Sequence, residues 1–391
     1  MASVVVKILC GFLLCIFFQT AAALSQHIDE TDLDILEQSS AAYKAGNYEK
    51  AFKLTKQVAD KGIKEAQTAV GAFYERGRGV EANYLKARLW YEKAVAQGHP
   101  AAFFNLGVLY EFGKGEIPKN TEKATDLYEQ AVALGNIEAH INLAMLLLEA
   151  STNDADNQRA ASLLAFAAAK KHPLAQVNLG LLYTDGKGVE KNPTVALRLF
   201  EAAAVQGNAE ALHHLGWIYA NGIGVEIDNT KALNFYELAA NKGHIISYNN
   251  IGLMYDSGVG VERDLNKAFD WYMKAAKAGY ALAQANVGMM YQTGDGVSPN
   301  SELAEHWYAM AAVQGATNAQ RLLAISIYKS NADRRKVAES YAWMKIASEG
   351  GDDEAVKLLA VIEQDLSEAE LQRAQKIFTD CMKIGLKNCP R

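Results

Sequence analysis

Closely spaced glycines are the first residues in this sequence whose spacing could support chemistry. Gly222 and Gly224 flank Ile223, and in nucleotide-binding proteins such glycines let backbone N–H groups approach a phosphate where a helix begins. The same spacing recurs at Gly77/Gly79, Gly113/Gly115, Gly186/Gly188, Gly258/Gly260 and Gly294/Gly296. From Gly186 to Gly294 each step is 36 residues. An enzyme needs one phosphate loop, so six pairs in register indicate an internal structural repeat instead.

Other patterns with catalytic potential are isolated. The segment Ser326 to Lys329 matches the Ser-x-x-Lys of penicillin-recognising enzymes, but neither Ser-Asp-Asn nor Lys-Thr-Gly occurs in the chain. Gly-x4-Gly-Lys-Ser/Thr and His-Glu-x2-His are also missing from the sequence. His213 and His214 are adjacent, so they point to different helix faces and are poorly placed to chelate one metal. We therefore predict a protein that is not an enzyme, with no catalytic residues, no metal site and no cofactor.

Composition argues against one class of partner. The 391 residues are 50% hydrophobic and carry a formal net charge of −6. A nucleic-acid-binding protein needs a basic stripe, whereas the basic residues here are spread over ordinary helix faces. Nucleic acid is therefore not expected as a partner, and the apolar fraction predicts a large core.

The N-terminus has the layout of a secretory signal peptide. Lys7 precedes an apolar run from Ile8 to Phe18, which is short for a membrane span, and the small residues Ala21 to Ala23 follow it. We predict that residues 1–23 form a signal peptide that is removed, with a retained membrane anchor as the alternative. Membrane contact is expected only through this transient segment.

The remaining cysteines and the missing glycosylation acceptors bear on location. After cleavage only Cys381 and Cys389 remain, and in an exported chain they allow one disulfide that closes the C-terminal tail, although two free thiols also fit. The proline in Asn192-Pro193-Thr194 blocks the single near match to an N-glycosylation acceptor. Long secreted eukaryotic proteins usually carry several acceptors. These observations favour a bacterial protein that is periplasmic or secreted.

Two helical patterns alternate between the glycines. The first places small and apolar residues at i, i+4, i+5 and i+8, as in Ala211, Leu215, Gly216 and Tyr219. The second uses i, i+3, i+4 and i+7, as in Ala232, Phe235, Tyr236 and Ala239. Each repeat is therefore predicted to be a helix, a turn, a second helix and a turn, with the aromatic residues in the core.

The glycines gain a structural explanation from this pattern. Gly222 falls just after the first helix and Gly243 just after the second, where a left-handed residue can end a helix without a Cβ clash. Good N-cap residues stand three positions after the loop valine, or at the equivalent place, in Asn83, Asn192, Asp228, Asp264 and Asn300. A capped helix start has less to offer a phosphate. We interpret the glycines as corners between helices.

The pattern resembles the Sel-one-like repeat (SLR) family, which is related to the tetratricopeptide repeat. Lys267 to Ala276, KAFDWYMKAA, followed by Gly279, is nearly the family pattern, and the resemblance extends over roughly residues 47–351. It implies an all-α fold, a right-handed α/α superhelical solenoid of about nine helix-turn-helix repeats. We expect the solenoid over residues 24–366. The capping box from Ser367 to Glu370 predicts a C-terminal capping helix and tail over residues 367–391.

Two copies of the repeat lack the corner glycines. They span residues 137–172 and 317–350, with Ser151 to Asn157 and Tyr328 to Arg334 in place of the corner. We expect irregular loops at these two places.

A superhelix of this kind implies an extended concave surface suited to a protein or peptide. Members of the family are adaptors in assembling complexes, including envelope complexes, and in some bacteria contact host-cell proteins. The resemblance therefore implies an exported, non-enzymatic scaffold. The alternative is a cell-envelope protein that handles polysaccharide or peptidoglycan and holds the glycan with aromatic residues of the concave face.

One position of the first helix is polar in six successive repeats: Asn105, Asn142, Asn178, His214, Asn250 and Asn286. A primary amide donates and accepts hydrogen bonds, so this ladder could pair with an extended peptide backbone in the groove. In related tetratricopeptide superhelices an asparagine just before Leu-Gly serves in this way. The neighbouring candidates for selectivity are Phe104, His213, Asn249, Trp217 and Met289. Alternatively, each amide bonds a neighbouring backbone or loop group and is structural.

Overall fold

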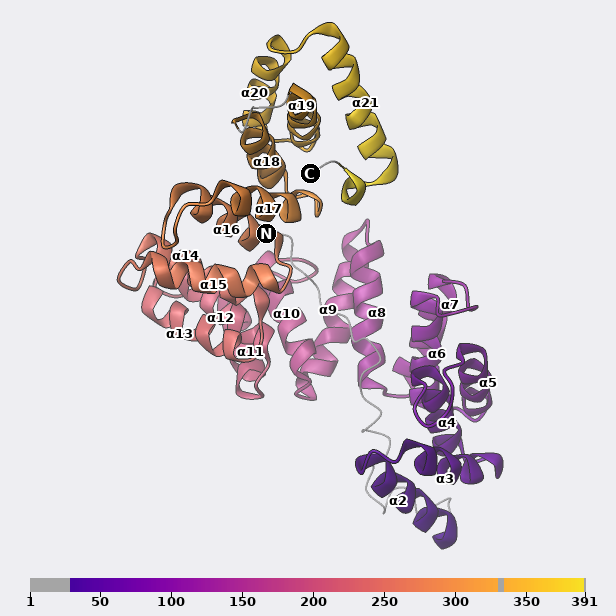
Figure 1. The fold of residues 1–391 in the computed structure, drawn as a ribbon. Helices are drawn as coiled ribbons and strands as arrows, with labels where there is room; N and C mark the ends of the chain where they lie inside the picture. The colour runs from indigo at the N-terminus through magenta and orange to yellow at the C-terminus, as the bar shows by residue number, and fades with distance from the viewer. Residues whose placement is uncertain (1–28, 330–333, 390–391) are drawn as a thin grey trace. The chain divides into compact units, whose positions relative to one another are not determined.

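A computed structural model describes residues 29–329 and 334–389 of the chain. The predicted signal peptide lies outside the described residues, as does most of the loop predicted at residues 328–334. The described residues contain α-helices and one short 3-10 helix, with no strand among them (Figure 1). Within the same residues, no helix combines the length and apolar character needed to cross a membrane.

The chain divides into two compact units, one ending at Gln206 and the other beginning at Gly207. Unit 1 contains α2 (Glu30–Lys44), α3 (Tyr48–Asp60), α4 (Lys64–Arg76), α5 (Tyr84–Val95), α6 (Pro100–Phe112), α7 (Thr121–Ala133), α8 (Ile137–Ala150), α9 (Asp154–Ala169), α10 (Pro173–Asp185) and α11 (Pro193–Val205). Unit 2 contains α12 (Ala209–Asn221), α13 (Asn229–Asn241), α14 (Ile245–Ser257), α15 (Leu265–Lys277), α16 (Ala281–Thr293), α17 (Ser301–Ala312), α18 (Thr317–Lys329), α19 (Arg334–Glu349), α20 (Asp353–Gln364), α21 (Glu368–Ile384) and η2 (Leu386–Asn388).

Helices pack in sequence order inside each unit. Each even-numbered helix from α2 to α18 packs on the helix that follows it, and within a unit each pair packs on the next pair. The described residues thus form nine helix pairs, after which α20 and α21 both pack against α19. The predicted all-α solenoid of helix-turn-helix repeats is confirmed. The Ser367 capping box at the start of α21 is also present.

A glycine on the first helix of a pair makes room for an aromatic ring on the second. A Cβ atom added to Gly216 would lie 2.6 Å from Cδ1 of Tyr236, and one added to Gly252 would lie 2.6 Å from Cδ1 of Tyr272. The same pairing joins Gly71 to Tyr91, Gly107 to Tyr128, Gly180 to Phe200 and Gly288 to Tyr308. All of these rings are buried. The alternation of small and aromatic residues in the sequence is therefore core packing between paired helices, as predicted.

The corner interpretation of the glycines is confirmed. Gly222 follows α12 with φ +66°, in the left-handed region, and its N–H donates to the carbonyl oxygen of Ile218. Asp228 then caps α13, because its side chain accepts a hydrogen bond from the N–H of Lys231 at 2.9 Å. The other predicted caps accept equivalent bonds at Asn83, Asn192, Asp264 and Asn300. The start of the second helix is thus already occupied by a side chain, which leaves no reason to assign a phosphate loop.

The irregular loop expected at residues 151–157 is shorter than predicted. α8 ends at Ala150 and α9 already begins at Asp154, and the Asn153 side chain caps it by accepting from the N–H of Asp156 at 3.0 Å. An early asparagine cap therefore replaces the glycine corner in this repeat. The turn that ends the same repeat carries Lys171 with φ +61° where neighbouring repeats have glycine.

Candidate partner-binding surface

The six ladder positions lie on the first helices α6, α8, α10, α12, α14 and α16, but they are not equally accessible. In unit 1 Asn142 and Asn178 are buried, with 0% and 1% of their surface exposed. Asn105 in unit 1, and His214, Asn250 and Asn286 in unit 2, are partly exposed. Asn142 and Asn178 therefore cannot touch a partner in this structure, and the binding hypothesis is left with the four partly exposed positions.

The amides of the ladder bond to groups inside the fold. The amide of Asn142 donates to the hydroxyl of Tyr128 at 3.3 Å, and that hydroxyl donates to Glu111 at 2.7 Å. The Asn250 side chain likewise hydrogen-bonds the hydroxyl of Tyr236. Asn286 donates to the side-chain oxygen of Asn249 at 3.2 Å. These contacts support the structural interpretation of the ladder, in which an amide satisfies a polar group of the preceding repeat.

The predicted selectivity residues separate into two groups. Phe104, His213 and Asn249 are buried, because the position before the ladder faces the neighbouring helices. Trp217 is partly exposed and Met289 is 43% exposed. Of these five side chains, only Trp217 and Met289 lie where a partner could contact them.

The position that follows the first-helix glycine distinguishes the two units. In unit 1 its apolar side chains are buried: Ala72, Val108, Met145 and Leu181. In unit 2 Leu253 and Met289 are 46% and 43% exposed, and Trp217 and Ile325 are partly exposed. The residue types are similar, so the packing around them, and not the sequence pattern, decides their exposure. The sequence analysis selected Trp217 and Met289 at this position and missed Leu253, although steps of 36 residues join all three.

We call the resulting surface of unit 2 the open face, defined by Trp217, Leu253, Leu282 and Met289 together with the partly exposed Asn250 and Asn286. Leu282 is 47% exposed and lies on α16 at the i, i+4, i+7 spacing with Asn286 and Met289, so the three share one side of the helix. The helices α12, α14 and α16 contain no lysine or arginine. The open face is therefore apolar with interspersed amides, and it lacks cations of its own.

Three histidines meet in unit 2, which the sequence did not predict. His213 and His214 come from α12, and His244 precedes α14. The ring centroids of His213 and His244 lie 4.4 Å apart. The hydroxyl of Ser247 lies 3.0 Å from Nδ1 of His213 and 2.9 Å from Nδ1 of His244. We call His213, His214, His244, Glu210 and Ser247 the histidine cluster.

Glu210 completes the cluster from the first turn of α12. Its carboxylate oxygens lie 3.1 Å from Nε2 of His244 and 3.4 Å from Nε2 of His214. Burial acts to raise the pKa of Glu210, but the hydrogen bonds and charges of His214 and His244 outweigh it and lower that pKa below its ordinary value. Burial, followed by the charges of His244 and His214, lowers the pKa of His213 to about 3.

The cluster has the residue types of a hydrolytic site but not its access. Ser247, His244 and Glu210 are connected as a nucleophile, a base and an orienting acid would be. Ser247, however, is fully buried between two imidazole rings, so its hydroxyl cannot reach a substrate. Within the described residues, no group of three or more histidine, cysteine or acidic side chains is arranged to hold a metal ion.

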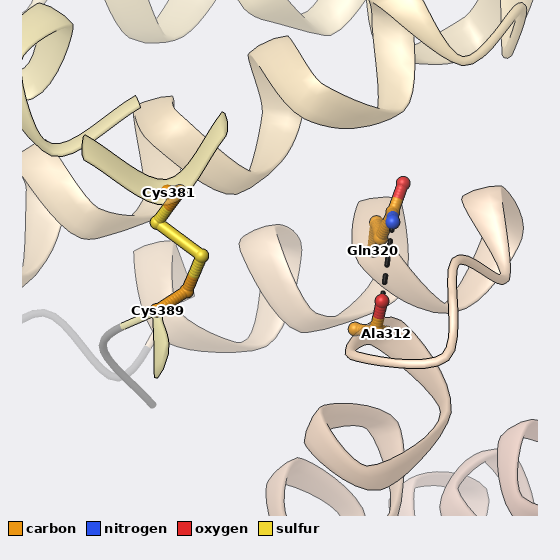
Figure 2. Close-up of a disulfide and its surroundings, with 4 residues drawn as sticks. All are labelled: Ala312, Gln320, Cys381 and Cys389. Carbon is orange, nitrogen blue, oxygen red and sulfur yellow. Dashed lines mark hydrogen bonds between the residues drawn. A yellow bond between two sulfur atoms is a disulfide. The ribbon is translucent and has the colours of Figure 1, made fainter. Parts of the chain in front are cut away.

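The C-terminal tail is joined to α21 through the cysteine pair (Figure 2). Cys381 on α21 and Cys389 beyond η2 are bonded, with their Cα atoms 5.2 Å apart. Both are buried and share one core cluster with Trp343 and Met344 of α19. The same view shows Gln320 of α18, whose amide donates to the carbonyl oxygen of Ala312 at 3.1 Å. The tail is thus part of the packing at the end of unit 2.

Relatives of known sequence match short parts of the chain. The ERAD-associated E3 ubiquitin-protein ligase component HRD3A of Arabidopsis thaliana is 34% identical over 68 residues, which are 17% of this chain and 10% of that protein. The chitin synthase regulator SKT5 of Saccharomyces cerevisiae is 35% identical over 79 residues, 19% of this chain and 11% of that protein. The chain therefore spans only about a tenth of the length of these two relatives.

A solved structure and a repeat family match far more. The crystal structure of a Sel1 repeat protein from Oxalobacter formigenes is similar with a TM-score of 0.56 and 28% identity, over 76% of this chain and 90% of that one. The Sel1 repeat itself matches residues 39–63, 64–99, 100–136, 173–208, 209–244, 245–280 and 281–315. These segments make up more than half of the sequence, and the similar structure from Oxalobacter formigenes is also a Sel1 repeat protein. The chain belongs to the Sel1 repeat family.

Proposed function

We propose that this protein is an exported, non-enzymatic scaffold that binds a protein or peptide partner on the open face of unit 2. Sel1 repeat proteins are in general protein-interaction scaffolds, and the open face is the observation that carries the proposal for this chain. Exposed Leu253, Leu282 and Met289 side chains would lose contact with water when a partner covers them, which favours binding by about 25 cal/mol for each Å² of apolar surface buried.

The chemistry of the open face favours a polypeptide partner. Asn250 and Asn286 each make one bond inside the fold, and a primary amide has further donor and acceptor capacity that an extended backbone can use. The lack of lysine and arginine on α12, α14 and α16 disfavours nucleic acid, which binds mainly through phosphate contacts. The surface therefore suits a segment with apolar side chains.

The exported location belongs to the proposal as well. It rests on the layout of residues 1–23 and on the small number of cysteines, and the location that we propose is the periplasm or the outside of a bacterial cell. A component of an envelope complex and a host-cell protein are the partners that fit this location. The names of the two curated relatives, a ligase component and a synthase regulator, support the scaffold role.

The test compares substitutions on the open face with one of equal exposure elsewhere. Leu253→Asp combined with Met289→Asp should abolish partner capture from envelope extracts. Leu238→Asp is the matched control, because Leu238 is 50% exposed on the second helix α13 and lies outside the open face. The wild type, the double variant and the control should have the same melting temperature within about two degrees, since these side chains lie at the surface.

Photo-crosslinkers placed at Leu253 and Met289 would identify what is captured. Capture that survives the double substitution would rule out the open face as the binding site. Parallel sedimentation with peptidoglycan and exopolysaccharide separates this function from the polysaccharide-handling alternative, which predicts co-sedimentation that does not depend on a protein partner.

A further inference from the structure

The histidine cluster holds two first helices of unit 2 together through a single chain of hydrogen bonds. The backbone N–H of Ser247 donates to Nδ1 of His244 at 3.3 Å, and this bond is the N-cap of α14. Nδ1 of His244 must therefore be an acceptor, which places the ring hydrogen on Nε2, where it points to Glu210 at 3.1 Å. α14 is thus capped by a side chain that is itself tied to α12.

The direction of the remaining bonds follows from the serine hydroxyl. Ser247 Oγ lies within 3.0 Å of an imidazole nitrogen on each side. Because Nδ1 of His244 accepts, the hydroxyl donates to His244, and its oxygen accepts from Nδ1–H of His213. The chain runs from His213 through Ser247 and His244 to Glu210, and every group in it has one consistent role while the imidazoles are neutral.

A proton added to this chain removes the bonds that hold it. On Nδ1 of His244 it would face the backbone N–H of Ser247, which can only donate, so the N-cap of α14 would be lost even when the Ser247 hydroxyl turns to accept. On Nε2 of His213, the ring nitrogen without a hydrogen, it would create a buried cation whose ring centroid lies 4.4 Å from that of His244. Glu210 is the facing carboxylate, His214 is a third imidazole on α12, and from α13 the titratable group in contact is Tyr236, 5.4 Å from His213 between ring centroids.

We propose that the histidine cluster is an acid-sensitive latch that joins α12 to α14 at neutral pH and releases them when the cluster is protonated. The latch borders the open face, because His214 lies one helical turn from Trp217 on α12 and Ser247 lies one turn from Asn250 on α14. Its consequence for partner binding, which is release on acidification, rests on the proposed function. The latch itself does not.

Two neighbouring repeats supply the variants for the test. Asn208 occupies in its repeat the position that His244 has here, and it caps α12 by accepting from the N–H of Ala211 at 2.9 Å. Val177 stands at the position of His213, where it is fully buried. The combination His213→Val and His244→Asn therefore keeps a cap and an apolar core while removing the two imidazole rings of the hydrogen-bond chain.

Hydrogen exchange read by mass spectrometry, without any partner, measures the latch in the full chain. Labelling times are scaled to the intrinsic exchange rate at pH 7.5 and pH 5.5. The pKa of His213 is about 3 when the cluster is closed and 6.5 when it is open. Lowering the pH from 7.5 to 5.5 should therefore raise the equilibrium constant for local opening of α12 and α14 roughly tenfold. Peptides from α16 serve as the internal reference, and the double variant should show no such rise.

His99→Asn is the matched control. His99 occupies the same turn in unit 1 and is buried against the hydroxyl of Thr68 at 2.7 Å. This substitution should leave the acid response of α12 and α14 intact. Wild-type protection of these helices that does not change with pH, or a rise that persists in the double variant, would overturn the latch. Partner capture that is lost through Leu253→Asp but does not change with pH would support the proposed function. The same result would show that the latch does not control release of the partner.

Discussion

His213 is held neutral in the folded protein because it is buried beside two other imidazoles. Its pKa of about 3 lies below the ordinary value of 6.5, so the unfolded chain binds a proton that the folded chain excludes. The stability that follows is fully present above pH 6.5 and is lost as the pH falls from 6.5 toward 3. Glu210, with its lowered pKa, acts in the same direction at pH values below its ordinary 4.5.

The global stability of unit 2 should therefore fall on acidification. Between pH 7.5 and pH 5 the linkage at His213 is worth about 2 kcal/mol in the free energy of unfolding. Urea unfolding followed by circular dichroism at both pH values measures the loss, and His213→Val should reduce it. If the free energy of unfolding falls equally with pH in the wild type and in His213→Val, His213 is not the group responsible.

At the scale of helices and turns, each corner depends on left-handed glycines, and Gly222 and Gly224 both have positive φ. Valine at Gly222 would have to adopt φ +66° and would place its Cβ 2.8 Å from Cγ1 of Ile227. We expect Gly222→Val to lower the free energy of unfolding by about 1–3 kcal/mol. Thermal unfolding measures the loss, and a melting temperature equal to that of the wild type would contradict the corner assignment.

Lys171 provides the opposite test in the turn that ends a repeat, where neighbouring repeats have glycine. It adopts φ +61° with a side chain that disfavours the left-handed region. Lys171→Gly should consequently raise stability, by about 1 kcal/mol, in the same unfolding measurement.

The tail that follows α21 depends on the disulfide between Cys381 and Cys389. Cys381 and Cys389 should resist thiol labelling without reductant in protein purified from an oxidising compartment. Reduction should loosen η2 and the last turn of α21. A closed loop of this length lowers the entropy of the unfolded chain, which contributes roughly 2–3 kcal/mol to the free energy of unfolding. Mass spectrometry with and without reductant measures both effects, and labelling of both cysteines in the native protein would show that they are free thiols.

The helix pairs, corners and caps could be predicted from the sequence because each depends on local residues. Gly222, Asp228 and the Gly216–Tyr236 pairing recur in register, so a single repeat nearly defines its own geometry. The accessibility of the ladder could not be predicted. Asn142 and Asn286 hold equivalent positions, yet only Asn286 is partly exposed, because the packing of the surrounding repeat differs.

The histidine cluster escaped sequence reasoning for a related reason. His213 and His214 are adjacent on α12, and their ring centroids lie 5.5 Å apart although neighbouring residues of a helix point in different directions. His244, however, reaches them from the start of the next helix pair, 30 residues after His214. A spacing of nearly one repeat was the available signal, since residues separated by one helix pair lie on neighbouring first helices.

For the whole molecule, the separation into two compact units means that damage should remain local. Alanine at Gly252 would place its Cβ 2.6 Å from the Tyr272 ring, and overpacking of this kind costs about 1–3 kcal/mol although alanine is the better helix former. In a repeat protein stability is shared mainly between neighbours. Hydrogen exchange should therefore show lost protection in α12 to α17, with α4 to α9 unchanged. An equal loss in both units would indicate that the chain unfolds as one cooperative body.

The constant step from Gly186 to Gly294 also has a genetic consequence. Recombination between two copies of the coding repeat adds or removes whole codons, so it never shifts the reading frame, and each corner supplies the same junction for the new copy. A gene of this construction can lengthen its product by one helix pair at a time, and a gain between α14 and α16 would add one further row to the surface offered to a partner. The number of repeats is thus a heritable quantity that selection can adjust without inventing a new fold.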